Sequence, residues 1–247
     1  MGKVTTGALE KLLVAARSTL QGPDAEQAQN AVLKALLDAT VYAHVPIEGA
    51  PSGRIRFIQF VRPDNGQTVL PFFSDRAQAE QPQRTNTSIV AMSGRRLFEL
   101  TRGATLMLNP NLDQVTLYPP EIVALLQGRE LGYFAKQTLE GGLSVGACLP
   151  TVSTDDLGTA LLGLFEEEQT VRSAYLTEVH REGECAEVFL LLTVVAAHAH
   201  QERLLQLATL ALKTRSTDLD LPLSILFVAP DAPLPEICHA GIQFFGR

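Results

Sequence analysis

The sequence predicts an α+β protein made of two domains. Three observations lead to this class. Some segments repeat their apolar residues at helical spacing, whereas others alternate or run continuously apolar, as strands do. A hairpin signal near residue 65 indicates antiparallel pairing. The length of 247 residues and the 46% hydrophobic content are enough for two domains of ordinary size, each with its own core.

The N-terminal region is expected to open with two helices. The second begins near Pro23, which suits a first helical turn, and Asp24 and Glu26 favour the positive end of the helix dipole. A β-branched strand follows at residues 40–47 and ends at a proline.

Residues 54–75 predict a β-hairpin. Asn65 and Gly66 tolerate the positive φ angles that tight hairpin turns need, and apolar runs flank them. Pro71 lacks a backbone donor, so we expect its strand to be an edge strand or to carry a bulge.

The remaining N-terminal elements are short. The pattern predicts a strand at 88–92, a helix at 93–103 that Gly103 ends, a strand before the Asn-Pro-Asn turn at 109–111, and then a strand and a helix within 115–128. Pro119 and Pro120 mark the start of that last helix.

From residue 141 the predicted order is strand, helix (153–169), strand (171–180), strand (187–196), helix (201–213) and strand (221–230). This βαββαβ order is that of a ferredoxin-like sandwich. We therefore expect an N-terminal mixed α/β domain at residues 1–140, whose residues 1–31 form an additional helical segment, and a ferredoxin-like domain at 141–247. Gly141 and Gly142 mark the boundary.

Charge is divided unevenly between the two regions. Residues 1–143 carry 14 Lys and Arg against 13 Asp and Glu, whereas residues 144–247 carry 6 against 14. An acidic C-terminal region is a poor ligand for phosphates, so we expect no nucleic acid partner. No apolar stretch is long enough for a membrane span and no signal peptide is apparent. Three widely spaced cysteines predict reduced thiols in the cytoplasm.

Ser144 is the one candidate nucleophile, because residues 142–146 (GLSVG) fit the G-x-S-x-G pattern of α/β-hydrolases. That pattern requires a strand before the serine and a helix after it. Here the strand-like residues follow the serine, so the glycines are better explained as a flexible entry to the second domain. We predict no catalytic residue.

Three histidines are candidate metal ligands. His198 and His200 are two residues apart and would share one face of a strand, and His239 follows Cys238. Their position at a strand–helix junction and the incomplete ligand set favour solvated side chains. We predict no metal and no cofactor.

Two charged groups are candidate binding surfaces. An acidic set could dock a protein partner: Glu166, Glu167, Glu168, Glu182 and Glu184. Arg95 and Arg96, near a glycine at a helix start, could contact an anion.

Several segments resemble the SseB family, the enhanced serine sensitivity proteins. Residues 41–47 (VYAHVPI), 56–75 and 106–126 are similar to its N-terminal domain; residues 173–195, 221–231 and the terminal GIQFFGR are similar to its C-terminal domain. The resemblance runs from about residue 32 to the end. It implies a bacterial, cytosolic, two-domain protein without enzymatic activity, and it implies no functional residues.

The functional prediction is therefore a non-catalytic factor that binds a protein partner. Two alternatives stay open: a serine hydrolase that uses Ser144, and a sensor that binds a small metabolite such as an amino acid between the domains.

Overall fold

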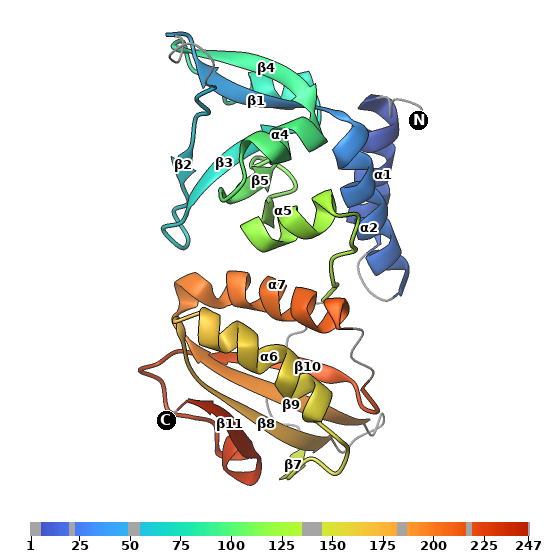
Figure 1. Ribbon diagram of the computed structural model, residues 1–247, viewed down its shortest axis with the longest axis vertical. Helices are drawn as coiled ribbons and strands as arrows, with labels where there is room; N and C mark the ends of the chain where they lie inside the picture. Colours follow the sequence, from blue (N-terminus) through green and yellow to red (C-terminus); the bar gives the residue numbers. More distant parts are fainter. Residues whose placement is uncertain are drawn as a thin grey trace. The chain divides into compact units, whose positions relative to one another are not determined.

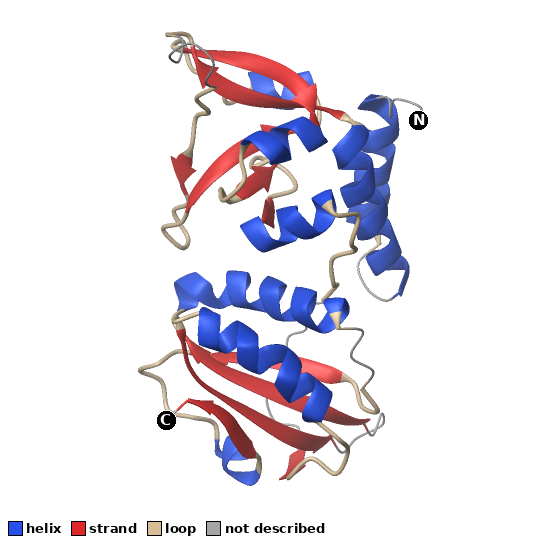
Figure 2. Ribbon diagram, in the orientation of Figure 1, coloured by secondary structure: helices blue, strands red, loops and turns tan. Residues whose placement is uncertain are grey.

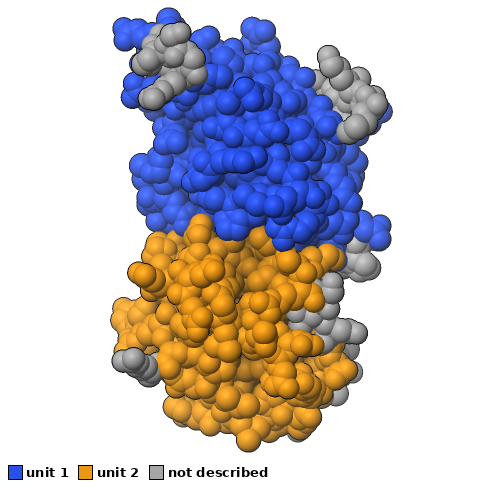
Figure 3. Space-filling view, viewed as in Figure 1, with its two compact units in different colours: residues 1–135 blue, residues 136–247 orange. Residues whose placement is uncertain are grey.

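The computed structural model describes residues 6–19, 23–48, 55–134, 145–181, 187–215 and 219–246. The chain divides into two compact units, residues 1–135 and 136–247, which Figure 3 colours separately. Each unit contains a mixed β-sheet and helices, so the α+β class is confirmed (Figure 2). The expected boundary between residues 140 and 141 lies in the segment 135–144, outside the described residues.

The N-terminal unit begins with two helices and continues with a sheet that short helices interrupt (Figure 1). Its sheet has the strand order β4-β1-β3-β5-β6, and β2 pairs with β3 beside β1. The elements are α1 (Thr6–Ser18), α2 (Pro23–Asp38), β1 (Thr40–Pro46), β2 (Phe60–Val61), β3 (Thr68–Phe73), α3 (Arg76–Glu80), β4 (Thr87–Ser93), α4 (Gly94–Leu100), β5 (Leu106–Leu108), β6 (Val115–Leu117) and α5 (Pro119–Leu126).

One face of β3 supplies aromatic packing to the core of this unit. Phe72 of β3 meets Phe98 of α4 edge-on, with ring centroids 5.9 Å apart. Both side chains are fully buried, as is Leu9 of α1. Because Leu9 is buried, α1 is part of the core of this unit. Burying a leucine side chain contributes about 1.5–3 kcal/mol to stability.

The predicted hairpin is confirmed, but the expectation for Pro71 is wrong. Gly66 has φ 71° in the turn, and β2 pairs antiparallel with β3. The strand β3 is central rather than an edge, with β5 on its other side. Leu70 donates its N–H to Thr105 on the β5 side, so the missing donor of Pro71 faces the opposite side. On that side of β3, β2 pairs only as far as Val69 and β1 pairs only from Phe72. Pro71 therefore faces no strand partner there, and no backbone donor is needed at its position.

The C-terminal unit places two long helices on one face of a twisted sheet (Figure 1). Its elements are β7 (Val145–Cys148), α6 (Asp155–Glu167), β8 (Val171–Arg181), β9 (Glu187–Ala196), α7 (His198–Thr214), β10 (Leu223–Val228), the 3₁₀ helix η1 (Glu236–Ala240) and β11 (Ile242–Gly246). Alternate residues of β8 and β9, among them Leu176 and Leu192, pack against Leu161 and Phe165 of α6 and Leu204 of α7.

The ferredoxin-like arrangement of this unit is not confirmed. The element order βαββαβ is present, but the strands lie in the order β10-β9-β8, and both β11 and β7 pair with β8. The strands β9 and β10 that flank α7 are adjacent and parallel, rather than separated by another strand as in a split βαβ unit. Helix and strand periodicity identifies elements, but strand neighbours depend on contacts between distant segments.

No helix in the described part of the chain is long and apolar enough to cross a membrane.

Candidate functional site

A cleft of about 610 Å³ lies in the N-terminal unit, within residues 44–114. Its apolar lining includes Pro71 and Phe73 of β3 and Met107 of β5, which face away from Phe72 and the helix α4. His44 of β1 also lines it, packs on Phe73 with ring centroids 5.2 Å apart, and donates from Nε2 to the Ala79 carbonyl at 2.8 Å. The cleft therefore has a rigid, largely apolar floor.

The lining of this cleft also contains charged groups. Arg62 is fixed by Asp64, to which its Nε donates at 3.1 Å, and by Thr116, to which its Nη1 donates at 2.9 Å. The hydrogen bonds from Arg62 hold the pKa of Asp64 below its usual range. Arg84 is exposed, and its guanidinium pairs with no other described side chain. The lining thus offers one neutralised pair and one available cation.

An apolar floor with a few polar groups at its edge is the usual form of a site that binds a ligand or an extended protein segment. Apolar side chains would fill the floor, and Arg84 would attract a carboxylate. Four prolines line the cleft and limit its backbone freedom: Pro63, Pro71, Pro82 and Pro110.

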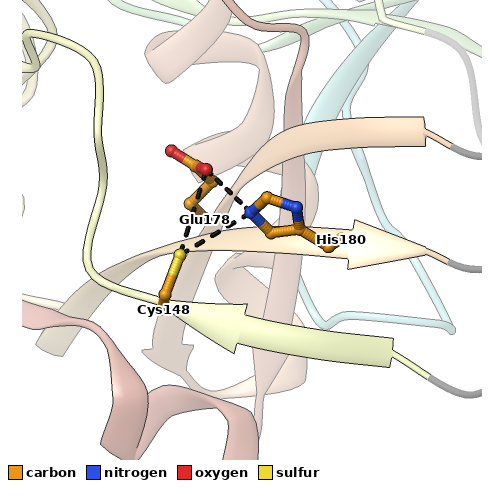
Figure 4. Close-up of side chains that lie close together, drawn as sticks. All are labelled: Cys148, Glu178 and His180. Atoms are coloured by element: carbon orange, nitrogen blue, oxygen red, sulfur yellow. Dashed lines mark hydrogen bonds and ion pairs between the residues drawn. The ribbon is translucent and has the colours of Figure 1, made fainter.

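A second cluster of reactive side chains lies in the C-terminal unit (Figure 4). Glu178 and His180 are two residues apart on β8 and so point to the same face. Cys148, the last residue of β7, is the direct register partner of Glu178. The Cys148 Sγ lies 3.7 Å from His180 Nε2 and 3.9 Å from Glu178 Oε1, and these last two atoms are 2.8 Å apart.

The carboxylate of Glu178 is buried, and both of its oxygens have hydrogen-bond partners. Its residue is 2% exposed, and its Oε2 accepts hydrogen bonds from Thr151, at 2.6 Å from the hydroxyl and 2.8 Å from the backbone N–H. The hydroxyl of Thr151, together with its N–H, holds the pKa of Glu178 below its usual range. The other oxygen, Oε1, faces His180 and Cys148.

The predicted acidic surface is divided by the structure. Glu166 and Glu167 are exposed at the end of α6. Glu168 is instead partly buried, because Arg203 of α7 donates to its two carboxylate oxygens at 2.6 and 3.2 Å. Glu182 and Glu184 lie outside the described residues.

The other predicted residues do not come together. Arg95 and Arg96 lie in the first turn of α4, where Ser93 caps the Arg96 N–H at 3.2 Å, and an anion site there stays a prediction. The expectation that His198 and His200 share a strand face is wrong, since α7 begins at His198 and residues two apart on a helix point about 200° apart.

Ser144, the candidate nucleophile, lies outside the described residues. The strand β7 begins immediately after it, at Val145, and the next helix, α6, begins only at Asp155. This is the strand-after-serine order expected from the sequence, the reverse of a nucleophile elbow.

Sequence reasoning missed the cluster of Cys148, Glu178 and His180, although part of its signal was present. The strand predicted over residues 171–180 contains both Glu178 and His180, and residues two apart on a strand share one face. The missing information was that β7 pairs with β8 in the register that sets Cys148 opposite Glu178.

Comparison with known proteins identifies the N-terminal region. Residues 9–124 match the family described as the SseB protein N-terminal domain, a match that begins in α1, well before residue 32. Protein SseB of Escherichia coli (strain K12) and Protein SseB of Shigella flexneri are each 33% identical to the chain over 144 residues, which is 56% of this chain and 54% of each relative. The chain thus spans about half the length of the curated relatives it matches. No solved structure matches the chain.

Proposed function

Because residues 9–124 match the SseB protein N-terminal domain, we propose that the chain is a non-catalytic factor that binds another protein. The observation that carries this proposal is the apolar cleft of about 610 Å³ on the sheet of that domain. The cleft receives an extended apolar segment of the partner, and Arg84 at its edge pairs with an acidic residue of that segment.

The described surfaces support a protein partner over other ligands. The acidic balance of residues 144–247 disfavours nucleic acid. Glu166 and Glu167 remain exposed and offer a second contact, for a basic patch of the same partner. The free thiols of Cys148 and Cys238 suit a reducing compartment, so we place this role in the cytoplasm.

Selection of a random displayed peptide library on the purified protein tests the cleft. We expect enriched peptides with apolar residues next to an acidic one. Their affinity, measured by fluorescence anisotropy, should fall about tenfold in Arg84→Glu, a loss of about 1.4 kcal/mol. Gln59→Trp should also weaken binding, because Gln59 is exposed and lines the cleft.

The matched control is Arg96→Glu, a charge reversal on α4 that lies outside the cleft lining. It should leave peptide affinity unchanged. If no peptide is enriched, or if the enriched peptides bind all variants equally, the cleft is not the binding site.

A separate labelling experiment tests the absence of serine catalysis. A broad serine-reactive phosphonate probe should not label the protein. Labelling that is lost in Ser144→Ala would overturn the non-catalytic assignment in favour of a hydrolase.

A further inference from the structure

The three side chains at the end of β7 and β8 converge on one point. Cys148 Sγ, Glu178 Oε1 and His180 Nε2 belong to three different ligand types, yet all lie within 4.8 Å of one another (Figure 4). Cys148 of β7 and Glu178 of β8 are direct register partners, and His180 lies two residues after Glu178 on β8. A paired sheet fixes this spacing more tightly than a loop would.

The distances fit the edges of a metal tetrahedron. With zinc bonds of about 2.3 Å to sulfur and about 2.0–2.1 Å to nitrogen and oxygen, the ligand atoms of a tetrahedral site lie about 3.3–3.6 Å apart. The Sγ–Nε2 and Sγ–Oε1 distances are 3.7 and 3.9 Å. The Nε2–Oε1 distance of 2.8 Å is a hydrogen bond, which must open by about half an ångström to admit the ion.

A cysteine–histidine–glutamate triad is the competing arrangement, and the geometry disfavours it. In a triad the histidine uses one ring nitrogen for the nucleophile and the other for the carboxylate. Here the same nitrogen, Nε2 of His180, faces both Cys148 and Glu178. Convergence on one nitrogen suits a shared metal ion rather than a relay of protons.

The surroundings orient Glu178 and leave His180 open to solvent. Thr151 holds the far oxygen of Glu178, and this contact turns Oε1 toward the cluster. The His180 side chain is 48% exposed, and its register partner is Gly146, which presents no side chain beside the ring. An ion would therefore enter from the exposed side of His180.

We propose that Cys148, Glu178 and His180 form a three-ligand site for a divalent transition metal of the zinc class, with a fourth position left to water. A thiolate and an imidazole select zinc, cobalt or a similar borderline ion over magnesium and calcium, which prefer oxygen ligands. This site is in the C-terminal unit and is independent of the cleft proposed for the protein partner.

The test uses the full chain, produced without a histidine tag, treated with a chelator and then titrated with Co²⁺. We expect one equivalent to produce a thiolate-to-cobalt charge-transfer band and the visible bands of tetrahedral cobalt, and Zn²⁺ to displace it. Cys148→Ser should abolish the charge-transfer band, and His180→Ala should abolish the stoichiometric binding. Far-UV circular dichroism should stay unchanged in both variants. Thr151→Val should weaken Zn²⁺ affinity about 10- to 100-fold, since it removes the hydroxyl that orients Glu178.

Matched controls come from the same unit. Cys238→Ser and His239→Ala change a cysteine and a histidine outside the cluster, and neither should alter cobalt binding. The absence of a charge-transfer band in the unmodified chain, or a band that persists in Cys148→Ser, would overturn the proposal. Either result leaves the peptide-binding proposal intact, because that depends on the N-terminal cleft.

Discussion

Asn109 and Ser74 bind each other across 35 positions of sequence. The Asn109 Oδ1 accepts the Ser74 backbone N–H at 2.9 Å, and its Nδ2 donates to the Ser74 Oγ at 2.9 Å and to Asp113 Oδ2 at 2.6 Å. Asn109 is fully buried and has φ 42°, a left-handed conformation that asparagine tolerates. This residue joins the ends of the parallel strands β3 and β5, next to Pro110 and Asn111, which line the cleft.

Replacing Asn109 should therefore be costly. We expect Asn109→Ala to lower the free energy of unfolding by about 3 kcal/mol, because it leaves buried groups of Ser74 unsatisfied and strains a left-handed residue. Urea denaturation followed by circular dichroism measures this change. The neighbouring exposed Asn111→Ala is the control and should change stability by less than about 0.5 kcal/mol. Equal effects of the two substitutions would contradict the role assigned to Asn109.

Two helical glycines should respond in opposite directions to alanine. A Cβ on Gly94, at the start of α4, would lie 1.9 Å from the Leu36 carbonyl oxygen of α2, so Gly94→Ala must push two helices apart. We expect a loss of about 2–3 kcal/mol. A Cβ on Gly158 of α6 would meet no atom within 4 Å, so Gly158→Ala should stabilise the chain by about 0.5–1 kcal/mol. Thermal denaturation of both variants measures the contrast, and a neutral Gly94→Ala would refute the close approach.

The Asp64 carboxyl should titrate at an unusually low pH. Hydrogen bonds from Arg62 stabilise its charged form, so its pKa in the folded chain lies below the usual value of about 3.9. Because the folded pKa is the lower one, the pair contributes stability above about pH 3.9, and this is lost as pH falls through the folded value. Asp64 is 56% exposed, so the contribution is below about 1 kcal/mol. Carbon-detected NMR titration should show the low pKa, and Arg62→Gln should raise the pKa of Asp64 toward its usual value. An unchanged titration would disprove the pairing in solution.

Charge reversal should separate stability from docking within the three consecutive glutamates. Glu168→Lys breaks the partly buried pair with Arg203 and should cost about 1–2 kcal/mol. The double variant Glu166→Lys, Glu167→Lys leaves that pair in place, and its unfolding free energy should change by less than about 0.5 kcal/mol. Chemical denaturation measures both. The double variant is therefore the suitable reagent for testing the acidic contact, and a large loss of its stability would show that these side chains are structural.

Local patterns predicted much of the fold correctly. The turn at Asn65 and Gly66, the proline start of α5 and the helix α4 that begins at Gly94 are all present near their predicted positions. Each depends on residues only a few positions apart, through φ preferences, caps and the periodicity of apolar side chains. Interactions between residues that are close in the sequence determine these features.

Strand pairing was the part that the sequence left open. The Pro71 strand lies between β1 and β5, and it tolerates the proline because β1 and β2 end on either side of that residue, which no local pattern states. The order of the C-terminal sheet likewise departs from the ferredoxin-like expectation, although every element of that order was identified. Each depends on which distant segments come together, and many pairings satisfy the same local preferences.

The sequence by itself therefore determined the α+β class, the sites of most helices and strands, and the acidic character of the C-terminal region. The tertiary structure alone decided that Cys148 faces Glu178 and His180, that Glu168 pairs with Arg203, and that an apolar cleft lies beside Phe73. The physical reason is range: secondary structure follows from interactions within a few residues, whereas a site is made by side chains that only strand register and helix packing bring together.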